Sequence, residues 1–310
     1  MIENQPLITI GITCFNAEET IARAIESAGK QDWENLEIII VDDHSTDSSA
    51  KIIKELQQKD KRVRIECHEK NLGYPSALNT IIKHARGEYI AFFDDDDDNE
   101  TSRIEKQYKR LSDFQESHPG SAVLCYAHRR VFVNGEEKPD AFVNAIGAAA
   151  PEPHGPAVAD FLLWHKKADG YTWGEFGSCT MMAPRKTLKK FGFDPNFRRS
   201  AEWDLVVRVA LDGGYFIAVD EPLVIQHKTQ TSDKAGRKPL DYALMLRKKH
   251  KGYLKENNVY LGAIFQAYSR FYYFRQKPWK SRLYLLLACL LSPTKIMAQE
   301  ITKRKTGSAH

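Results

Sequence analysis

The 310-residue sequence lacks both features that would place it within a membrane or in a secretory route. No stretch reaches the roughly 20 apolar residues that a membrane-spanning helix needs, and the apolar run at 283–291 has only nine. The N-terminus has neither the basic start nor the apolar stretch of a signal peptide. We therefore expect no spanning segment and no leader.

The sequence also lacks any spacing of cysteines that would indicate a metal site or a disulfide framework. Its five cysteines are scattered, and several lie within apolar runs typical of core strands. An odd set of unpaired thiols indicates a reducing compartment, so we expect a cytoplasmic protein. The net charge of +4 is too small to indicate nucleic-acid binding.

Strand and helix patterns alternate through the first half. Strands are predicted at 7–14, 36–41, 62–67 and 89–93, and helices at 17–30, 46–59, 75–85 and 101–117. This alternation predicts an α/β fold with a doubly wound, mostly parallel, Rossmann-like sheet. Ligands of such sheets bind beyond the carboxyl ends of the strands, so the functional residues should lie there.

A run of five aspartates, 94–98, directly follows the apolar strand at 89–93. Such a concentration of hard oxygen ligands is what Mg²⁺ or Mn²⁺ needs, usually together with substrate phosphates. A solvated acidic loop is the alternative. Two other strand ends, at 13–16 and 42–45, are also polar, which favours one shared site at this rim.

The second half is less regular. An Ala-, Pro- and Gly-rich segment at 139–157 predicts a loop, and a helix at 201–212 precedes a strand at 215–219. The polar, basic segment 228–239 could close over phosphates as a lid or remain an ordinary loop. From residue 240 onward the pattern predicts helices interrupted at Pro278 and Pro293.

Four motifs resemble, in order and spacing, those of the family 2 glycosyltransferases, and in particular bacterial surface-polysaccharide enzymes. The motifs are Ile10–Asn16, Ile39–Asp47, Asn71–Gly73 with Ala77–Asn79, and Gly87–Asp97. The resemblance covers residues 6–230 and implies the GT-A fold. It implies a catalytic domain at 1–239, with a nucleotide-binding half at 1–117 and an acceptor-binding half at 118–239. A helical, basic C-terminal extension would follow at 240–310.

The resemblance implies that the first strand end and the aspartate pair after the second strand hold the base of a nucleotide-sugar. Thr13, Phe15 and Asn16 would line the nucleotide pocket. Asp43 would accept a hydrogen bond from the ring N–H of the base. The alternative for Asp42 and Asp43 is turn and cap chemistry alone.

The aspartate run falls on the Asp-x-Asp position of the family. The resemblance implies that Asp96 binds Mn²⁺ or Mg²⁺, while Asp94 or Asp95 reaches the ribose or a metal-bound water. The remaining two aspartates, 97 and 98, could cap the helix that follows. His227 would complete the metal shell or contact the diphosphate, unless it is only structural.

The family places its general base in a Glu-Asp-x-x-Leu pattern near position 200, where this sequence has Ala201-Glu202-Trp203-Asp204-Leu205. Ala201 occupies the first acidic position, which leaves Glu202 as the predicted base and Asp204 as its runner-up. Both could instead favour the helix dipole, with Asp204 paired to Arg208.

The resemblance also implies an acceptor-binding segment. Aromatic faces against sugar rings would explain its composition, although the same residues could form ordinary core. The candidates are Trp173, Glu175 and Phe176.

These features predict a metal-dependent, inverting glycosyltransferase acting in cell-surface polysaccharide synthesis. It would move a sugar from a nucleotide-sugar, with a UDP-sugar favoured, to a hydroxyl of a saccharide or lipid-linked saccharide. A sugar-nucleotide nucleotidyltransferase would want a Gly-rich phosphate loop after the first strand, and residues 13–18 contain no glycine. A non-catalytic saccharide- or membrane-binding scaffold is favoured by Ala201 and opposed by the aspartates.

The apolar run at 283–291 is flanked by basic and aromatic residues. This composition suits a helix lying on an anionic membrane face, which predicts peripheral contact with the inner face of the cell membrane. The alternatives are packing on the catalytic domain and a dimer contact. A lipid-linked acceptor would fit the membrane prediction by analogy.

Overall fold

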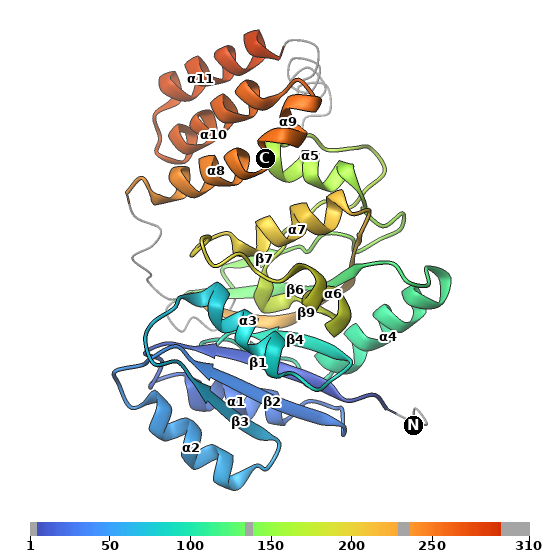
Figure 1. The fold of residues 1–310 in the computed structure, drawn as a ribbon, viewed down its shortest axis with the longest axis vertical. Coiled ribbons are helices and arrows are strands. Elements are labelled where there is room, and N and C mark those ends of the chain that lie inside the picture. The colour runs from blue at the N-terminus through green and yellow to red at the C-terminus, as the bar shows by residue number, and fades with distance from the viewer. Residues whose placement is uncertain (1–4, 134–138, 229–235, 293–310) are drawn as a thin grey trace. The chain divides into compact units, whose positions relative to one another are not determined.

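The computed structural model of the chain describes residues 5–133, 139–228 and 236–292 (Figure 1). The chain forms two compact units, Met1–Val158 with Asp169–Thr229, and Ala159–Ala168 with Gln230–His310. All predicted site residues belong to the first unit. The sequence predicted a boundary at 239 and did not indicate that 159–168 joins the second unit.

The first unit is built on a mixed β-sheet. Its strands are β1 (Ile8–Cys14), β2 (Leu36–Asp42), β3 (Val63–Cys67), β4 (Tyr89–Phe93), β5 (Asp98–Asn99), β6 (Val123–Val133), β7 (Ala141–Val143), β8 (Met182–Pro184) and β9 (Tyr215–Lys228). Within the described residues they form one nine-stranded sheet in the order β3-β2-β1-β4-β8-β6-β9-β5, with β7 paired to β6.

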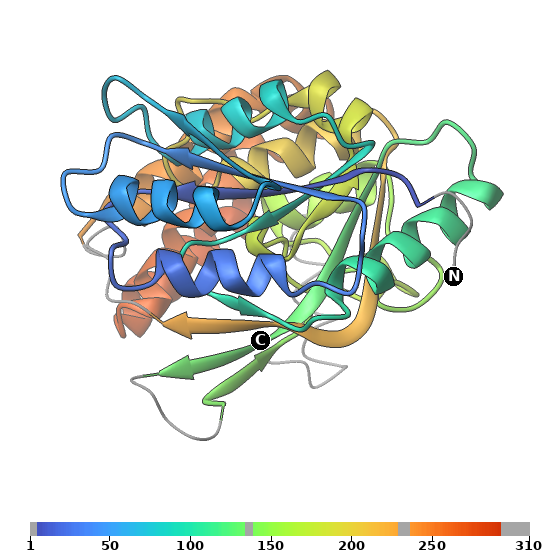
Figure 2. The same cartoon turned by 90° about the horizontal axis from the view of Figure 1, so that it is seen from below.

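The ladders β1–β2, β1–β4 and β2–β3 are parallel, and so is the long pairing of β6 with β9 (Figure 2). β8 runs antiparallel to β4 and β6, and β5 runs antiparallel to β9. Most paired residues therefore lie in parallel ladders, and the prediction of a mostly parallel α/β sheet is confirmed.

Helices cover both faces of this sheet. They are α1 (Ile21–Gly29), α2 (Ser49–Lys59), α3 (Tyr74–His84), α4 (Arg103–Ser117), the 3₁₀ turn η1 (Ser178–Thr180), α6 (Arg185–Phe191) and α7 (Ala201–Leu211). α1 and α2 lie on one side and α3 on the other (Figure 1). The isoleucines of β1 are fully buried. Gly11 lets α3 approach closely, because a Cβ there would lie 2.4 Å from Ile81 Cγ2.

Most predicted element boundaries are within a few residues of those observed. α2 begins at Ser49 and not at 46, since the Asp47 carboxylate accepts the backbone N–H groups of Ser49 (2.9 Å) and Glu18 (3.0 Å). The segment predicted as a loop, 139–157, contains the short strand β7. The strand predicted at 215–219 continues to Lys228 as β9, whose pairing with β6 shifts register at Ala127–Arg129.

The second unit is helical. Residues 159–168 contribute most of α5 (Pro156–Trp164) to it. Its other helices are α8 (Lys238–Lys249), α9 (Lys251–Glu256), α10 (Tyr260–Phe274) and α11 (Pro278–Leu291). The Tyr268 and Tyr284 rings stack 5.0 Å apart between α10 and α11. Among the described helices none has the length and apolar character needed to cross a bilayer. Most of the predicted lid (229–235) and the end of the extension (293–310) lie outside the described residues.

Candidate active site

The carboxyl ends of β1 and β2 are joined by the side chain of Asn16. Its backbone takes the left-handed conformation (φ 51°), which asparagine tolerates better than most residues. The Asn16 side-chain oxygen accepts the backbone N–H of Thr46 at 2.8 Å, and the backbone N–H of Asn16 donates to Ser45 Oγ at 2.9 Å. The two strand ends predicted to hold a nucleotide therefore form one connected surface.

Two further residues predicted for the nucleotide pocket lie at this end of β1. Thr13 is buried, whereas the Phe15 ring is 48% exposed. The Phe15 backbone N–H donates to Asp95 Oδ2 at 3.2 Å. This contact connects the end of β1 to the aspartate run that follows β4, so the structure brings together residues from three strand ends.

Asp43 organises the segment that precedes α3. Its carboxylate accepts the backbone N–H groups of Leu72 (2.8 Å) and Gly73 (2.7 Å), and it pairs with His68 Nδ1 at 2.6 Å. Two of these contacts use Oδ1 and one uses Oδ2, so Oδ2 keeps a second lone pair that these three contacts do not use. Asp43 thus makes the predicted turn contacts and keeps acceptor capacity.

The aspartate run does not continue β4 but turns. Residues 95 and 96 form the centre of a turn, which brings Asp94 and Asp97 together. One oxygen of each carboxylate and the Cys179 Sγ all lie within 4.8 Å of one another. Asp97 is 1% exposed, and its Oδ1 accepts the His227 backbone N–H at 3.0 Å. Its Oδ2 has no hydrogen-bond partner among the described residues.

This cluster strongly disfavours the ionised form of its carboxyl groups. Burial, followed by the charge of Asp96, raises the pKa of Asp94 and of Asp95 to about 7. Burial, followed by the charges of Asp94 and Asp96, raises the pKa of Asp97 to about 9. Carboxylate oxygens are hard donors, and a divalent cation would relieve their repulsion, so the donor set fits Mg²⁺ or Mn²⁺.

The last aspartate of the run forms a separate group with His227. Asp98 Oδ2 pairs with His227 Nε2 at 2.9 Å and with Arg23 Nε at 3.3 Å. The prediction that Asp97 and Asp98 cap the next helix is wrong. Asp98 lies in β5, which pairs with β9, and α4 begins later, at Arg103. The predicted metal ligand His227 therefore touches Asp98 through its ring and Asp97 through its backbone.

The two candidate bases at the start of α7 have different surroundings. Burial raises the pKa of Glu202, while Arg199 and Arg129 lower it by smaller amounts. Asp204 is fully buried, and Arg208 Nε donates to its Oδ2 at 2.8 Å. Asp204 thus makes the ion pair that the sequence offered as its structural alternative, and Glu202 remains the candidate base.

Sequence reasoning missed Arg129, which β6 carries into the site. Its guanidinium pairs with Glu175, and its charge acts on Glu202 and Asp97. Gly177 makes room for it, because a Cβ at that position would lie 2.9 Å from Arg129 Nη1. The only signal in the sequence is an arginine near the end of an apolar strand, which is too common to be informative.

The predicted acceptor segment divides into core and accessible parts. Phe176 is 3% exposed and packs edge-on against Tyr126 and Phe216, so it belongs to the core. Glu175 is 61% exposed beside Arg129. Trp173 is partly exposed and meets another ring, Tyr171, edge-on at 5.8 Å.

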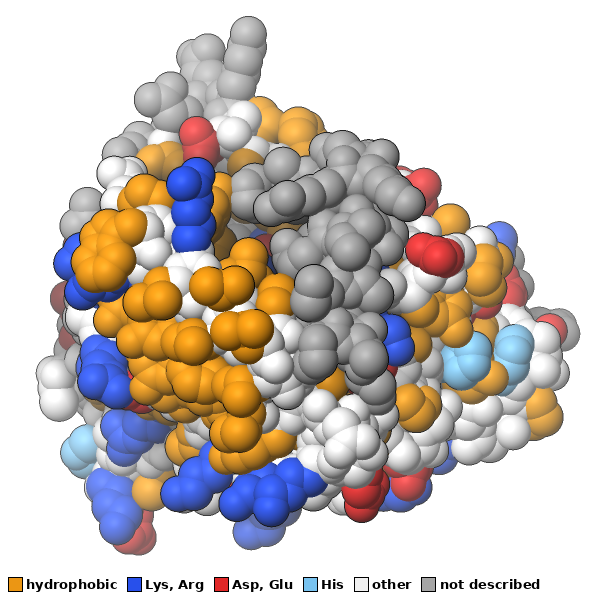
Figure 3. Space-filling model, turned by 90° about the horizontal axis from the view of Figure 1, so that it is seen from above, with side chains coloured by type: hydrophobic (Ala, Val, Ile, Leu, Met, Phe, Trp, Pro, Cys, Tyr) orange, Lys and Arg blue, Asp and Glu red, His pale blue; other side chains and the backbone are white. Residues whose placement is uncertain are grey.

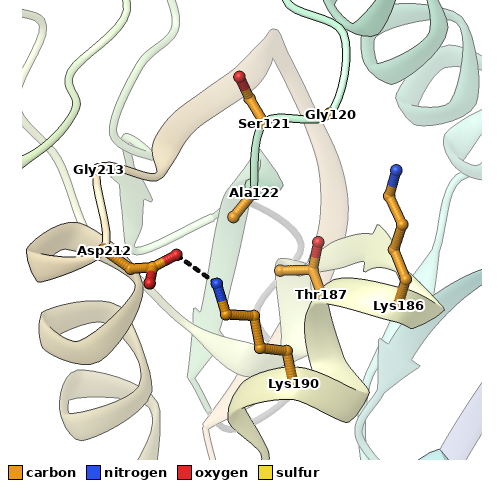
Figure 4. Close-up of a pocket in the computed structure, with 8 residues that line it drawn as sticks. All are labelled: Gly120, Ser121, Ala122, Lys186, Thr187, Lys190, Asp212 and Gly213. Carbon is orange, nitrogen blue, oxygen red and sulfur yellow. Dashed lines mark hydrogen bonds and ion pairs between the residues drawn. The ribbon is translucent and has the colours of Figure 1, made fainter.

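A pocket of about 360 Å³ lies away from these residues, at the N-terminal ends of β6 and β9 (Figure 4). Lys190 and Asp212 form an ion pair across it at 2.6 Å. Since β6 runs parallel to β4, this is the edge of the sheet opposite the aspartates. The pocket contains no predicted site residue and belongs to a different surface.

Comparison with known proteins gives a consistent assignment. Residues 9–141 match the family model described as Glycosyl transferase family 2. An uncharacterized glycosyltransferase of Haemophilus influenzae is 40% identical over 104 residues, which cover 34% of this chain and 42% of that relative. The match therefore spans less than half of that protein.

Two relatives match over greater length. An uncharacterized glycosyltransferase of Methanocaldococcus jannaschii is 28% identical over 271 residues, 84% of this chain and 86% of the relative. The amylovoran biosynthesis glycosyltransferase AmsB of Erwinia amylovora is 22% identical over 255 residues, 81% of this chain and 80% of the relative.

Solved structures show the same fold. TarS of S. aureus in complex with UDP-GlcNAc has a TM-score of 0.58 at 17% identity, with 90% of each chain covered. The mannosyltransferase PcManGT from Pyrobaculum calidifontis, in complex with GDP-Man and Mn²⁺, has a TM-score of 0.57 at 16% identity and covers 98% of this chain and 81% of its own. The predicted GT-A fold is confirmed.

Proposed function

Residues 9–141 belong to glycosyl transferase family 2, as the motifs predicted, and we propose that the chain is a glycosyltransferase with a nucleotide-sugar donor. The observation that carries this proposal is the connected rim formed by Asn16, Asp43 and the Asp94–Asp97 turn. Hydrogen-bond acceptors that suit a base and a carboxylate group that suits a cation lie there at the carboxyl ends of parallel strands.

The donor we propose is a UDP-sugar. The free acceptor capacity of Asp43 Oδ2 suits the ring N–H of a uracil base, and the exposed Phe15 ring offers an apolar surface beside it. TarS, which shares the fold, binds UDP-GlcNAc. AmsB acts in amylovoran biosynthesis, which supports a role in surface-polysaccharide synthesis.

The cation we propose is Mn²⁺ or Mg²⁺, held by Asp96 together with the carboxylates of the turn. The unpartnered Asp97 Oδ2 and the raised pKa values of Asp94 and Asp97 support a cation at this turn, and the choice of Asp96 rests on the family resemblance. When bound, the ion supplies positive charge that neutralises the diphosphate leaving group. PcManGT, with the same fold, was solved with Mn²⁺.

Glu202 is the general base in this proposal. It takes the proton from an acceptor hydroxyl while that oxygen attacks the anomeric carbon from the face opposite the diphosphate. The bond from the anomeric carbon to the phosphate oxygen breaks, the nucleoside diphosphate leaves, and the configuration inverts. Burial raises the pKa of Glu202, which makes its carboxylate a stronger base than that of an exposed glutamate.

The acceptor we propose is a saccharide or lipid-linked saccharide, met at the cytoplasmic side of the cell membrane. Trp173 offers a partly exposed aromatic face for a sugar ring, and Glu175 offers a carboxylate for its hydroxyls. His227, whose Nε2 pairs with Asp98, would in this proposal contact the diphosphate or complete the metal shell.

A thermal-shift panel of UDP, GDP, dTDP and CDP, with and without Mn²⁺, tests the proposal. Saturation about 100-fold above Kd stabilises a protein by about 2.7 kcal/mol, which is roughly 5–10 °C for a unit of this size. We expect such a shift with UDP and Mn²⁺ together. Asp96→Ala should abolish it, whereas the exposed control Asp113→Ala should not.

Two outcomes count against the proposal in different ways. No shift with any nucleotide would refute donor binding. A shift without any Mn²⁺-dependent hydrolysis of the UDP-sugar would favour the non-catalytic scaffold, whose support is Ala201 at an ordinarily acidic position.

A further inference from the structure

The second unit exposes an unusual amount of apolar surface. Many large hydrophobic side chains of α10 and α11 are more than 40% exposed. They are Leu261 (52%), Tyr273 (48%), Phe274 (68%), Trp279 (65%), Leu283 (47%), Leu286 (57%), Leu290 (65%) and Leu291 (44%). Side chains of this kind form a contiguous patch in the view towards α11 (Figure 3). Exposed patches of this kind mark sites of interaction.

The patch follows one face of α11. Trp279, Leu283, Leu286 and Leu290 are spaced by four, three and four residues, which aligns them along a single side of a helix. The opposite side is occupied by contacts within the unit, because Ala288 is buried and Tyr284 stacks on rings of α10. The exposed stripe is therefore not required to close the core of this unit.

The charged side chains of the two helices that form the patch are all basic, and together they are called the basic border here. From Asn257 to Ser292 the chain has no Asp or Glu, and its charged side chains are Arg270, Arg275, Lys277, Lys280 and Arg282. Lys and Arg side chains lie beside the apolar surface in Figure 3. Trp279, at the start of α11, is of the amphipathic aromatic type enriched at membrane interfaces.

We propose that this face of α10 and α11 binds the surface of an anionic phospholipid bilayer, with the leucine stripe entering the interface and the basic border contacting lipid phosphates. Helices with one apolar face and basic flanks bind membranes in this orientation. The inference does not depend on the identity of the donor or on catalysis.

A second copy of the chain and the chain's own C-terminal residues would fit the basic border of this face less well than an anionic bilayer. A symmetric dimer through this face would place the basic border of one copy against the same border of the other, since a two-fold interface repeats the same surface. The chain end at 293–310 contains four Lys and Arg and one Glu, so covering the face with it would add positive charge.

Vesicle co-sedimentation of the full chain tests the inference. Vesicles of phosphatidylcholine with about one third phosphatidylglycerol should bind the protein at about 0.1 M salt. The affinity for vesicles of pure phosphatidylcholine should be lower by about tenfold or more. Salt of about 0.5 M should weaken binding to the anionic vesicles, because it screens the basic border.

Matched variants separate the contribution of the leucine stripe from that of the basic border. Leu286→Ser with Leu290→Ser should weaken binding about tenfold or more, whereas Leu211→Ser on the other unit should not. The triple change Lys277→Gln, Lys280→Gln and Arg282→Gln should weaken binding about 100-fold, because each basic residue contributes about fivefold. The control triple is Lys51→Gln, Lys54→Gln and Lys59→Gln, which removes three exposed lysines from α2.

Melting temperature and the UDP–Mn²⁺ shift, measured without vesicles, should be the same in these variants as in the parent protein. A lower melting temperature or a missing UDP–Mn²⁺ shift would identify a folding defect in that variant. The vesicle test would then use Lys280→Gln alone. The inference is overturned if the parent protein does not bind anionic vesicles, or if the leucine variants bind as well as it does. A dimer that dissociates on Leu286→Ser and Leu290→Ser, without vesicle binding, would assign the face to a second copy.

Discussion

Glu202 and Asp204 lie two residues apart in the first turn of α7, yet we expect their amide variants to fail in opposite ways. Glu202→Gln should remove most of the activity and leave the fold intact. Asp204→Asn should weaken the fold while the remaining folded protein keeps its turnover. The contrast follows from what each carboxylate contacts.

The cost of Asp204→Asn can be worked from its ion pair. Arg208 donates to Asp204 and to the carbonyl oxygens of Phe191 and Gly192, so the pair joins α7 to the end of α6. Removing one member of a buried pair costs about 3–5 kcal/mol. Arg208 is 23% exposed and recovers some hydration, so we expect about 2–3 kcal/mol and a melting temperature lower by about 5–10 °C.

Glu202→Gln has the opposite signature. Loss of a general base costs about 10²–10⁴ in kcat. The raised pKa means that the folded state disfavours the ionised form, so above the ordinary pKa of 4.5 the carboxylate costs stability. The glutamine should therefore melt at the same temperature as the parent or higher. In the parent, kcat should rise with pH through the raised pKa as the base ionises.

The assay combines melting curves with initial rates of nucleoside diphosphate release at saturating donor and acceptor. Rates are divided by the folded fraction, so that instability is not mistaken for lost chemistry. An Asp204→Asn protein with the parent's melting temperature and no turnover would refute the reasoning and make Asp204 the base. So would a Glu202→Gln protein that keeps more than about a tenth of the parent's kcat.

Three further changes give separate tests. Glu37→Gln should lower the free energy of unfolding by about 2–3 kcal/mol in denaturant titrations, because the buried carboxylate accepts the Thr9 hydroxyl at 2.6 Å and two backbone N–H groups. Trp173→Ala should raise the acceptor KM about tenfold, while Phe176→Leu should lower only the melting temperature; equal KM effects would contradict this division. His227→Gln should raise the Mn²⁺ concentration needed for half-maximal activity about 10–100-fold. An unchanged Mn²⁺ titration would show that His227 is only structural.

The first half of the fold was predictable because its signals are local. Buried β-branched runs such as Ile8–Cys14 and Leu36–Asp42 alternate with amphipathic helices, and the parallel order follows from that alternation. The aspartate run was placed correctly at the end of β4. Its internal arrangement was not, because the turn at residues 95 and 96 makes Asp94 and Asp97 neighbours, and nothing in five identical residues indicates where a chain turns.

The second half depends on contacts that sequence spacing does not encode. In the sequence Phe176 cannot be told from an exposed sugar-binding ring. Only its packing against Tyr126 of β6 and Phe216 of β9 makes it core. Asp98 was predicted at a helix start, but β5 pairs with residues 224 and 225 of β9, which puts its carboxylate against His227. Arg129 enters the site because β6 lies beside β9, a pairing that no local pattern predicts.

Arg129 also gives the site an electrostatic link between its two carboxylate groups. Its positive charge lowers the pKa of Asp94, of Asp97 and of Glu202, while the charge of Glu202 raises that of Asp94. The charges of these carboxyl groups therefore influence one another's pKa values. Positive charge added at the Asp94–Asp97 turn would lower the pKa of Glu202 as well. A cation bound at that turn would therefore leave Glu202 more fully ionised.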